Sequence, residues 1–109
     1  MTPKNPHPNE VTRRRIETFF PSRDPEKLVN AALECKGGYI LQEIRPYFKD
    51  PSIKTESPYA KLIYTVSTDT WKIYWRRANG DWNQLAEMKA PLEQALEFIK
   101  SNPNGCFFG

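Results

Sequence analysis

Histidine and cysteine, on which many catalytic and metal-binding sites depend, are scarce in this chain. His7 is the only histidine in 109 residues, and it precedes the first hydrophobic pattern of the sequence. A Ser-His-Asp or Cys-His pair in the core is therefore excluded, and so is every metal site built on histidines. Walker A, dinucleotide-binding and metalloprotease motifs are also missing. We expect the protein to use no metal and no cofactor.

The two cysteines lie far apart, at Cys35 and Cys106, and neither belongs to a Cys-x-x-Cys pair. This spacing argues against a zinc site and against a disulfide framework. Long apolar runs are missing as well. The first ten residues are polar and rich in proline, so no secretory signal is visible, and no stretch approaches the length of a membrane span. These absences predict a cytoplasmic protein with free thiols and no membrane partner.

The residues that are present suffice for one modest core. Hydrophobic residues make up 39% of the chain and aromatic residues 13%, while charged residues account for 27%. We predict a single domain over residues 9–109, preceded by a flexible arm at residues 1–8 that contains three prolines. The net charge of +3 permits an anionic partner but does not require one.

Two helices are predicted, one near each end of the chain. Asn9 is a suitable N-cap for a helix over residues 10–20, and Pro21 would end it. For a second helix, over residues 92–99, Pro91 suits the start, and four apolar residues recur with the spacing of one helical face. Those four are Leu92, Ala95, Leu96 and Ile99.

Residues 26–35 fit two descriptions. Asp24-Pro25-Glu26 is a good helix start, and the apolar residues that follow it have helical spacing. The Gly37-Gly38 pair, which separates this segment from residues 39–44, indicates a β-hairpin instead. The residues alone leave both descriptions open. Residues 46–58 hold three prolines, and we predict a long loop there.

Residues 60–87 predict a three-stranded antiparallel meander. Asn79-Gly80 indicates a two-residue type I′ turn, which sets Trp75 opposite Gln84, and we take Thr68-Asp69 as a second two-residue turn. Alternation along the strands then separates two faces. The apolar face would carry Ala60, Leu62, Tyr64, Val66, Trp71, Ile73, Trp75, Trp82 and Ala86. The opposite, basic face would carry Lys61, Ile63, Thr65, Lys72, Tyr74, Arg76, Asn83 and Leu85.

Together these patterns predict an α+β fold. We expect an antiparallel β-meander of four to five strands, with an N-terminal helix and a C-terminal amphipathic helix packed on one face. The C-terminal helix should lie on the side of the sheet that carries the tryptophans, because both surfaces are apolar.

Several short motifs of the chain stand out in addition. They are Arg45-Pro46, Pro58-Tyr59-Ala60, Trp71-Lys-Ile-Tyr-Trp75, Asn79-Gly-Asp-Trp82 and Gly105-Cys-Phe-Phe-Gly109. In these motifs the chain resembles a bacterial family of small proteins known as domain of unknown function 3024, from about residue 26 to the end. The resemblance implies that residues 26–35 form a strand, paired with residues 39–44 through the Gly37-Gly38 turn. It implies no catalytic residues.

The basic face is the candidate binding surface. Exposed aromatic side chains on a basic sheet are how several folds stack single-stranded bases. The residues expected to contribute are Lys61, Lys72, Tyr74 and Arg76, with help from Arg13, Arg14 and Arg15. We predict a non-enzymatic binding module, whose partner could be another protein, a second copy of the chain or a nucleic acid.

An enzyme is the least favoured alternative. Glu34 and Glu43 could approach each other across the hairpin, but they would be solvated there, and catalytic carboxylates need burial. Cys106 has no base beside it in the sequence, so a small buried side chain is the better interpretation of this cysteine.

Overall fold

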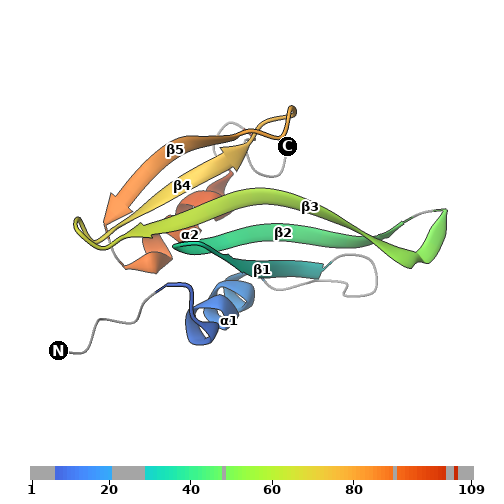
Figure 1. Ribbon diagram of the computed structural model, residues 1–109, viewed down its shortest axis with the longest axis horizontal. Helices are drawn as coiled ribbons and strands as arrows, with labels where there is room; N and C mark the ends of the chain where they lie inside the picture. The colour runs from blue at the N-terminus through green and yellow to red at the C-terminus, as the bar shows by residue number, and fades with distance from the viewer. Residues whose placement is uncertain (1–6, 21–28, 48, 90, 103–104, 106–109) are drawn as a thin grey trace.

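The structure, a computed structural model, describes residues 7–20, 29–47, 49–89, 91–102 and 105. The elements are α1 (Glu10–Phe19), β1 (Val29–Cys35), β2 (Gly38–Tyr47), β3 (Asp50–Thr65), β4 (Thr70–Arg76), β5 (Trp82–Lys89) and α2 (Leu92–Ser101). The five strands form one antiparallel sheet in the order β1-β2-β3-β4-β5 (Figure 1). The predicted α+β meander with a helix at each end is therefore confirmed.

Helix α1 begins where the sequence predicts. Its N-cap is Asn9, whose side-chain Oδ1 accepts a hydrogen bond from the backbone N–H of Thr12 at 2.8 Å. This bond satisfies one of the donors that a helix leaves free at its start. The helix ends at Phe19, one residue before the predicted end, and Phe20 is its C-cap. Residues 1–6 of the predicted arm lie outside the described residues.

The segment that fitted two descriptions is a strand at residues 29–35, as the family resemblance implied. β1 pairs with β2 so that Cys35 lies opposite Gly38, which places the turn at Lys36-Gly37, one residue before the predicted Gly37-Gly38 turn. Gly38 is needed for a different reason. A Cβ atom at Gly38 would overlap the backbone carbonyl oxygen of Leu62 on β3, so only glycine allows the two strands to approach here.

Tertiary packing explains why β1 contains alanine, a poor strand former. Ala32 is 2% exposed, and its backbone N–H donates a hydrogen bond to the Glu17 Oε2 of α1 at 3.0 Å. A small side chain at this position lets α1 approach the edge of the sheet, so packing outweighs the local preference. The alternative helix start at Asp24-Pro25-Glu26 lies outside the described residues.

The predicted loop over residues 46–58 is wrong, because this segment continues two strands. β1 pairs with β2 only as far as Ile44, and β4 pairs with β3 only from Ala60 onward. Beyond these points β2 and β3 leave the sheet as a two-stranded ribbon (Figure 1). Prolines are tolerated because each ribbon strand has a free edge, and the pairing shifts register beside Pro46 and close to Pro58.

The register between β3 and β4 differs from the prediction by two residues. Tyr64 pairs with Trp71, because the connection is a four-residue turn over residues 66–69 and not a two-residue turn at Thr68-Asp69. A shift of two residues leaves every paired side chain on its predicted face. Of the residues predicted for β3 and β4, only Val66 leaves the apolar face, because it lies in the turn and is 79% exposed.

The turn between β4 and β5 is not the predicted type I′ turn. A type I′ turn requires a positive φ at both central residues, but in the Asn79-Gly80 pair only Gly80 has one, at 92°. The loop contains three residues, 78–80. It is closed by a hydrogen bond of 2.9 Å from the backbone N–H of Arg77 to the carbonyl oxygen of Asp81.

This turn moves the adjacent pairing by one residue, and a shift of one residue changes the face. Trp75 pairs with Asn83 instead of Gln84, and Trp82 pairs with Arg76. Trp82 therefore lies on the face opposite to the predicted one, and Asn83 moves to the helix-covered face.

A β-bulge corrects the register further along β5. Leu85 has no partner on β4, and beyond it Ile73 pairs with Ala86, as predicted. The extra residue explains why Ala86 keeps its predicted face although Trp82 does not.

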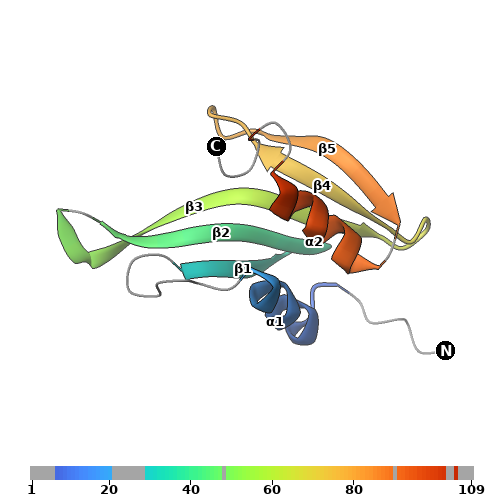
Figure 2. The same ribbon diagram turned by 180° about the vertical axis from the view of Figure 1, so that it is seen from behind.

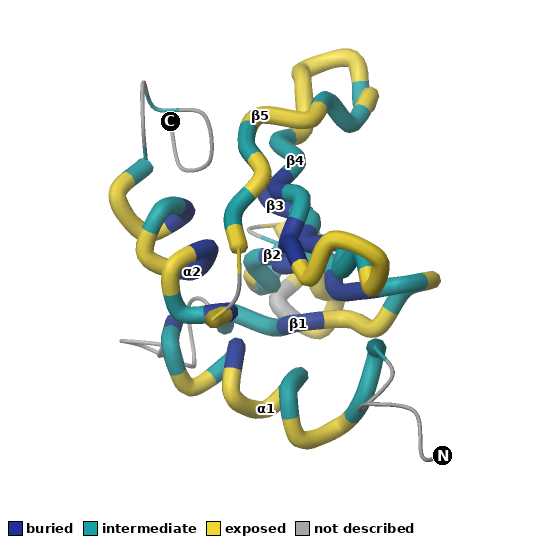
Figure 3. The backbone as a smooth tube through the Cα atoms, turned by 90° about the vertical axis from the view of Figure 1, so that its left-hand side faces the viewer, coloured by how far each residue is buried: buried dark blue, intermediate teal, exposed yellow. Residues whose placement is uncertain are grey.

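Both helices pack on the same face of the sheet (Figure 2, Figure 3). The four predicted apolar residues of α2 are buried there, and α1 adds Ile16 and Phe20 to the same core. Trp71 is buried, and Trp75 packs against the core while partly buried. The predicted packing of α2 on the side that carries Trp71 and Trp75 is confirmed, whereas Trp82 takes no part in it.

No described helix or strand covers the opposite side of the sheet, which we call the open face. Strand pairing places one set of residues on it, since paired residues share a face. Among the residues of the open face are Leu33, Cys35, Ile40, Lys61, Ile63, Lys72, Tyr74, Arg76, Trp82, Gln84 and Glu87.

Candidate functional site

Three side chains on the open face form a compact group, which we call the aromatic cluster. Lys61 on β3 places its Nζ 5.3 Å from the ring centroid of Tyr74 on β4 and 5.3 Å from that of Trp82 on β5. Both distances are typical of cation–π contacts, and both aromatic residues are half-buried. The cluster therefore presents two aromatic rings beside one positive charge.

Two further cations border the aromatic cluster. Lys72 and Arg76 lie on β4, on either side of Tyr74 and on the same face. Neither forms an ion pair with a described carboxylate. Glu87 lies opposite Lys72 in the register, and its carboxylate accepts a hydrogen bond from the Thr70 hydroxyl at 2.6 Å. The face thus keeps a positive character around its aromatic rings.

The part of the open face on β1 and β2 is apolar. Leu33, Ile40, Lys61 and Tyr74 lie in one row across four strands, because each pairs with the next. Leu33 is 44% exposed, while Ile40 and the neighbouring Ile63 are half-buried. The open face therefore changes from apolar at β1 and β2 to basic and aromatic at β3, β4 and β5.

The structure does not bring the basic run of α1 to this face. Arg13, Arg14 and Arg15 belong to α1, which packs on the other side of the sheet (Figure 2). Arg13 and Arg14 form ion pairs with Glu10 at 2.8 and 2.9 Å, and their hydrogen bonds lower the pKa of the Glu10 carboxyl to about 2. Arg15 forms an ion pair with Glu93 of α2. The three guanidinium groups therefore have structural partners.

The structure separates the two carboxylates of the enzymatic alternative. Glu34 pairs with Tyr39, and Glu43 pairs with Asn30. The two carboxylates are thus four residues apart along the hairpin, about 13 Å at the usual rise per residue. Glu43 lies 3.3 Å from the guanidinium of Arg45 instead. The hypothesis of a Glu34–Glu43 pair is wrong.

The other candidate for covalent chemistry, Cys106, lies outside the described residues. Cys35 is a free thiol, and burial raises its pKa although nearby Lys61 acts in the opposite direction. Within the part of the chain that the structure describes, no three His, Cys, Asp or Glu side chains gather in a way that could hold a metal ion. The helices of that part are all too short or too polar to cross a membrane.

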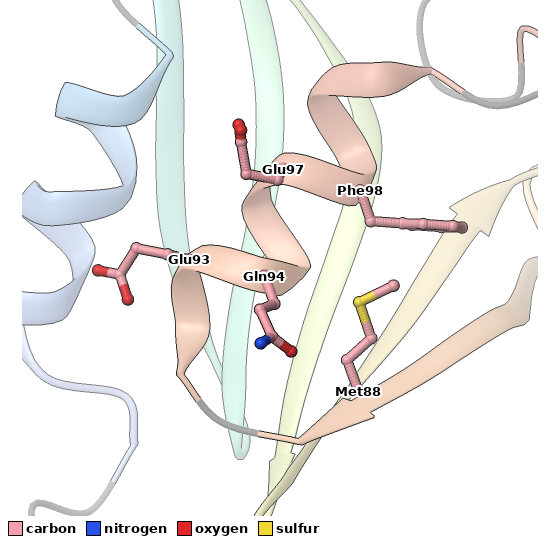
Figure 4. A pocket seen from close by; sticks show the side chains of 5 residues that line it. All are labelled: Met88, Glu93, Gln94, Glu97 and Phe98. Atoms are coloured by element: carbon pink, nitrogen blue, oxygen red, sulfur yellow. The ribbon is translucent and has the colours of Figure 1, made fainter.

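A shallow groove of about 500 Å³ lies on the helix side, between α2 and the end of β5 (Figure 4). Its walls are formed by Met88, Glu93, Gln94, Glu97 and Phe98. Sequence reasoning did not indicate it, because Met88 follows the last residue of the predicted meander. Ligand sites usually gather a few polar groups around a common point, and this groove does not. The open face is the better candidate.

Trp82 is the candidate residue that sequence reasoning misplaced. An Asn-Gly pair also fits a three-residue hairpin loop that ends in glycine, and this alternative would have moved Trp82 to the basic face. The structure thus keeps Lys61, Lys72, Tyr74 and Arg76 together, adds Trp82 to them and leaves the α1 arginines elsewhere.

Comparison with known proteins gives one finding. The model of a protein family, described as Domain of unknown function (DUF3024), matches residues 4–109. The match covers nearly all of the chain, so the protein belongs to this family. No curated protein and no solved structure shows a significant match.

Proposed function

We propose that this member of the DUF3024 family is a non-enzymatic binding module that holds single-stranded nucleic acid on its open face. One observation carries the proposal: Lys61 lies against the rings of Tyr74 and Trp82 on a sheet surface that no described element covers. We further propose that the protein acts in the cytoplasm.

The chemistry of the aromatic cluster matches that of a single strand. Unpaired bases stack on aromatic side chains, and this contact tolerates any sequence because every base has a flat aromatic face. Tyr74 and Trp82 are diagonal neighbours on adjacent strands, about 7–8 Å apart, so they can receive two bases. Lys72 and Arg76 lie beside them, where they would attract the phosphates. A duplex keeps its bases stacked inside and should bind less well.

A protein partner, including a second copy of this chain, is the second candidate. The observation that favours it is the exposure of Leu33 beside Ile40 and Ile63 at the β1–β2 end of the open face. Contiguous apolar surface of this kind marks protein interfaces. This alternative uses other residues of the same face, so substitutions can separate the two.

Fluorescence anisotropy with a labelled single-stranded oligonucleotide tests the proposal. We expect binding at low salt that weakens steeply as salt increases, because bound phosphates release counterions. The double variant Lys72→Ala with Arg76→Ala should flatten the logarithmic salt dependence by about one unit for each phosphate that the variant no longer binds. Tyr74→Ala and Trp82→Ala should each weaken binding by about 1–3 kcal/mol, the usual contribution of one stacked base.

The matched control is Arg14→Ala with Lys100→Ala, which removes the same charge from the helix side of the molecule. Equal weakening by both double variants would mean that only net charge matters, and the open face would lose its role. Absence of binding at low salt would exclude nucleic acid. In that case sedimentation of the wild type and of Leu33→Asp would test the second candidate, self-association.

A further inference from the structure

His7 is enclosed by three aromatic rings on the helix-covered side of the sheet. The ring centroids of Tyr39, Tyr64 and Trp71 lie 5.7, 5.1 and 4.8 Å from the centroid of the His7 imidazole. We call these three residues the aromatic box. Tyr39 and Trp71 are both buried core residues. The only histidine of the chain is therefore packed against the core at the start of the described structure.

A chain of hydrogen bonds links His7 to the start of α1. The Nδ1 atom of His7 lies 2.7 Å from the Oη of Tyr39, and this oxygen accepts a hydrogen bond from the backbone N–H of Asn9 at 3.0 Å. The Oη accepts from Asn9 and from the Thr12 side chain, so its own hydrogen is directed to Nδ1. An Nδ1 that accepts this hydrogen belongs to the neutral imidazole with its proton on Nε2. Asn9 is the N-cap of α1, so neutral His7 supports the helix start.

Protonation of His7 would disturb this arrangement. The imidazolium carries hydrogens on both ring nitrogens, so its Nδ1 can only donate to the Tyr39 Oη, and it then faces the amide Nδ2 of Asn9, another donor, at 3.5 Å. Burial lowers the pKa of His7, because the charged form loses hydration inside the box. The titratable groups around the box are Tyr39 on β2, Tyr64 on β3, Asp69 in the following turn and Glu34 on β1, while Cys35 acts electrostatically on Tyr39 from the open face. Asp69 already accepts the hydrogen bond of the Tyr64 hydroxyl.

We propose that His7 is a pH-operated clasp. As a neutral imidazole it holds the first turn of α1 on the sheet, and when the imidazole takes up a proton this turn detaches. Further along α1, Glu17 accepts the hydrogen bond of the Ala32 N–H at the outer edge of β1. Opening of the first turn would leave this contact, and the buried Ile16 beside it, in place. The clasp is independent of the nucleic-acid proposal, because it lies on the other side of the sheet.

The pKa of His7 sets the pH range over which the clasp opens, and the pKa shifts of Glu10 and Cys35 act outside this range. The folded-state pKa of His7 is below its ordinary value of 6.5, so the clasp contributes fully above pH 6.5 and is lost as pH falls through the folded-state pKa. The ion pairs of Glu10 respond at lower pH, because its pKa falls from 4.5 to about 2 on folding. Cys35 titrates above this range, since its pKa is raised from 9.0.

Two measurements on the wild-type protein test the clasp. The Cε1–H signal of the single histidine, followed by NMR against pH, should give a pKa below 6.5. Amide hydrogen exchange, corrected for its intrinsic pH dependence, should show a loss of protection in α1 between about pH 7 and pH 5, while β2 and β3 stay protected.

Two variants serve as controls. His7→Gln keeps an acceptor without a titrating group, and His7→Phe keeps a ring in the aromatic box; protection of α1 should then not change over the same pH range. A wild-type pKa at or above 6.5, or unchanged protection of α1 on acidification, would overturn the proposal. So would an equal loss of protection in His7→Gln. Should the variants fold poorly, the two wild-type measurements decide the question by themselves.

Discussion

The three tryptophans occupy three different surroundings, although they lie within a dozen residues of one another. Trp71 is 3% exposed in the core, and Trp75 is partly buried with the guanidinium carbon of Arg77 at 5.9 Å from its ring. Trp82 contacts Lys61 on the open face. Identical side chains should therefore make unequal contributions to stability and binding.

Substitution of single tryptophans tests this assignment. Trp71→Ala should lower the free energy of unfolding by about 3–5 kcal/mol, because truncation of a large buried aromatic leaves a cavity. Trp82→Ala should cost much less, since solvent already reaches this residue. Urea unfolding followed by circular dichroism measures both. Equal losses would contradict the register of β4 and β5.

A second residue-scale prediction concerns the close approach of β2 and β3. Gly38→Ala should lower stability by about 1–3 kcal/mol, because the added Cβ must displace the carbonyl of Leu62. Leu33→Ala in the same hairpin is the control, expected within about 0.5 kcal/mol because the Leu33 side chain is exposed. Thermal melting of the two variants should therefore differ clearly, and similar melting temperatures would speak against the close strand contact.

At the scale of elements, the sequence predicts those helices and strand faces that the local spacing of apolar residues determines. Helix α2 follows from its apolar spacing alone, and the faces of β3 and β4 survive a register error of two residues. The ribbon could not be predicted, because proline is tolerated only where a strand has a free edge. The free edges of β2 and β3 begin where β1 and β4 stop pairing with them. Those end points depend on the whole sheet and not on the local sequence. Likewise, the face of Trp82 depends on whether the loop that contains Asn79-Gly80 has two or three residues.

The ribbon should contribute little to stability. Replacing residues 46–54 by a two-residue Asn-Gly turn between Arg45 and Thr55, which are paired, should leave the melting temperature nearly unchanged. Residues 52–57 are all exposed, and an isolated two-stranded ribbon is only marginally stable. Calorimetry measures the effect. A large fall in melting temperature would mean that another molecule or copy covers the ribbon in solution.

At the scale of the whole molecule, the sheet separates two tasks. One side buries the core under both helices (Figure 3), and the other side carries the aromatic cluster. Four of the candidate site residues could be predicted from alternation, because Lys61, Lys72, Tyr74 and Arg76 belong to adjacent strands. The position of the α1 arginines could not, because it depends on which face of the sheet the helix covers.

The end of the chain carries a further prediction. Phe107 and Phe108 lie outside the described residues, but two adjacent phenylalanines left in solvent would form an exposed apolar patch, which folded proteins tend to avoid. We expect them to dock on the rest of the protein. Deletion of residues 106–109 should then lower the melting temperature clearly. An unchanged melting temperature would indicate that the tail serves a partner instead.

The hydrogen bond between Glu17 and the Ala32 N–H also limits how copies of this protein can assemble. A sheet with two open edges can add strands from further copies on both sides, and such growth has no end. Here Glu17 of α1 binds the Ala32 N–H at the β1 edge, so this donor is not available to a strand of another copy. Two copies that join through their β5 strands, at the other end of the strand order, would form a pair related by a twofold axis. The contact that α1 makes with β1 thus disfavours growth of the sheet from that side.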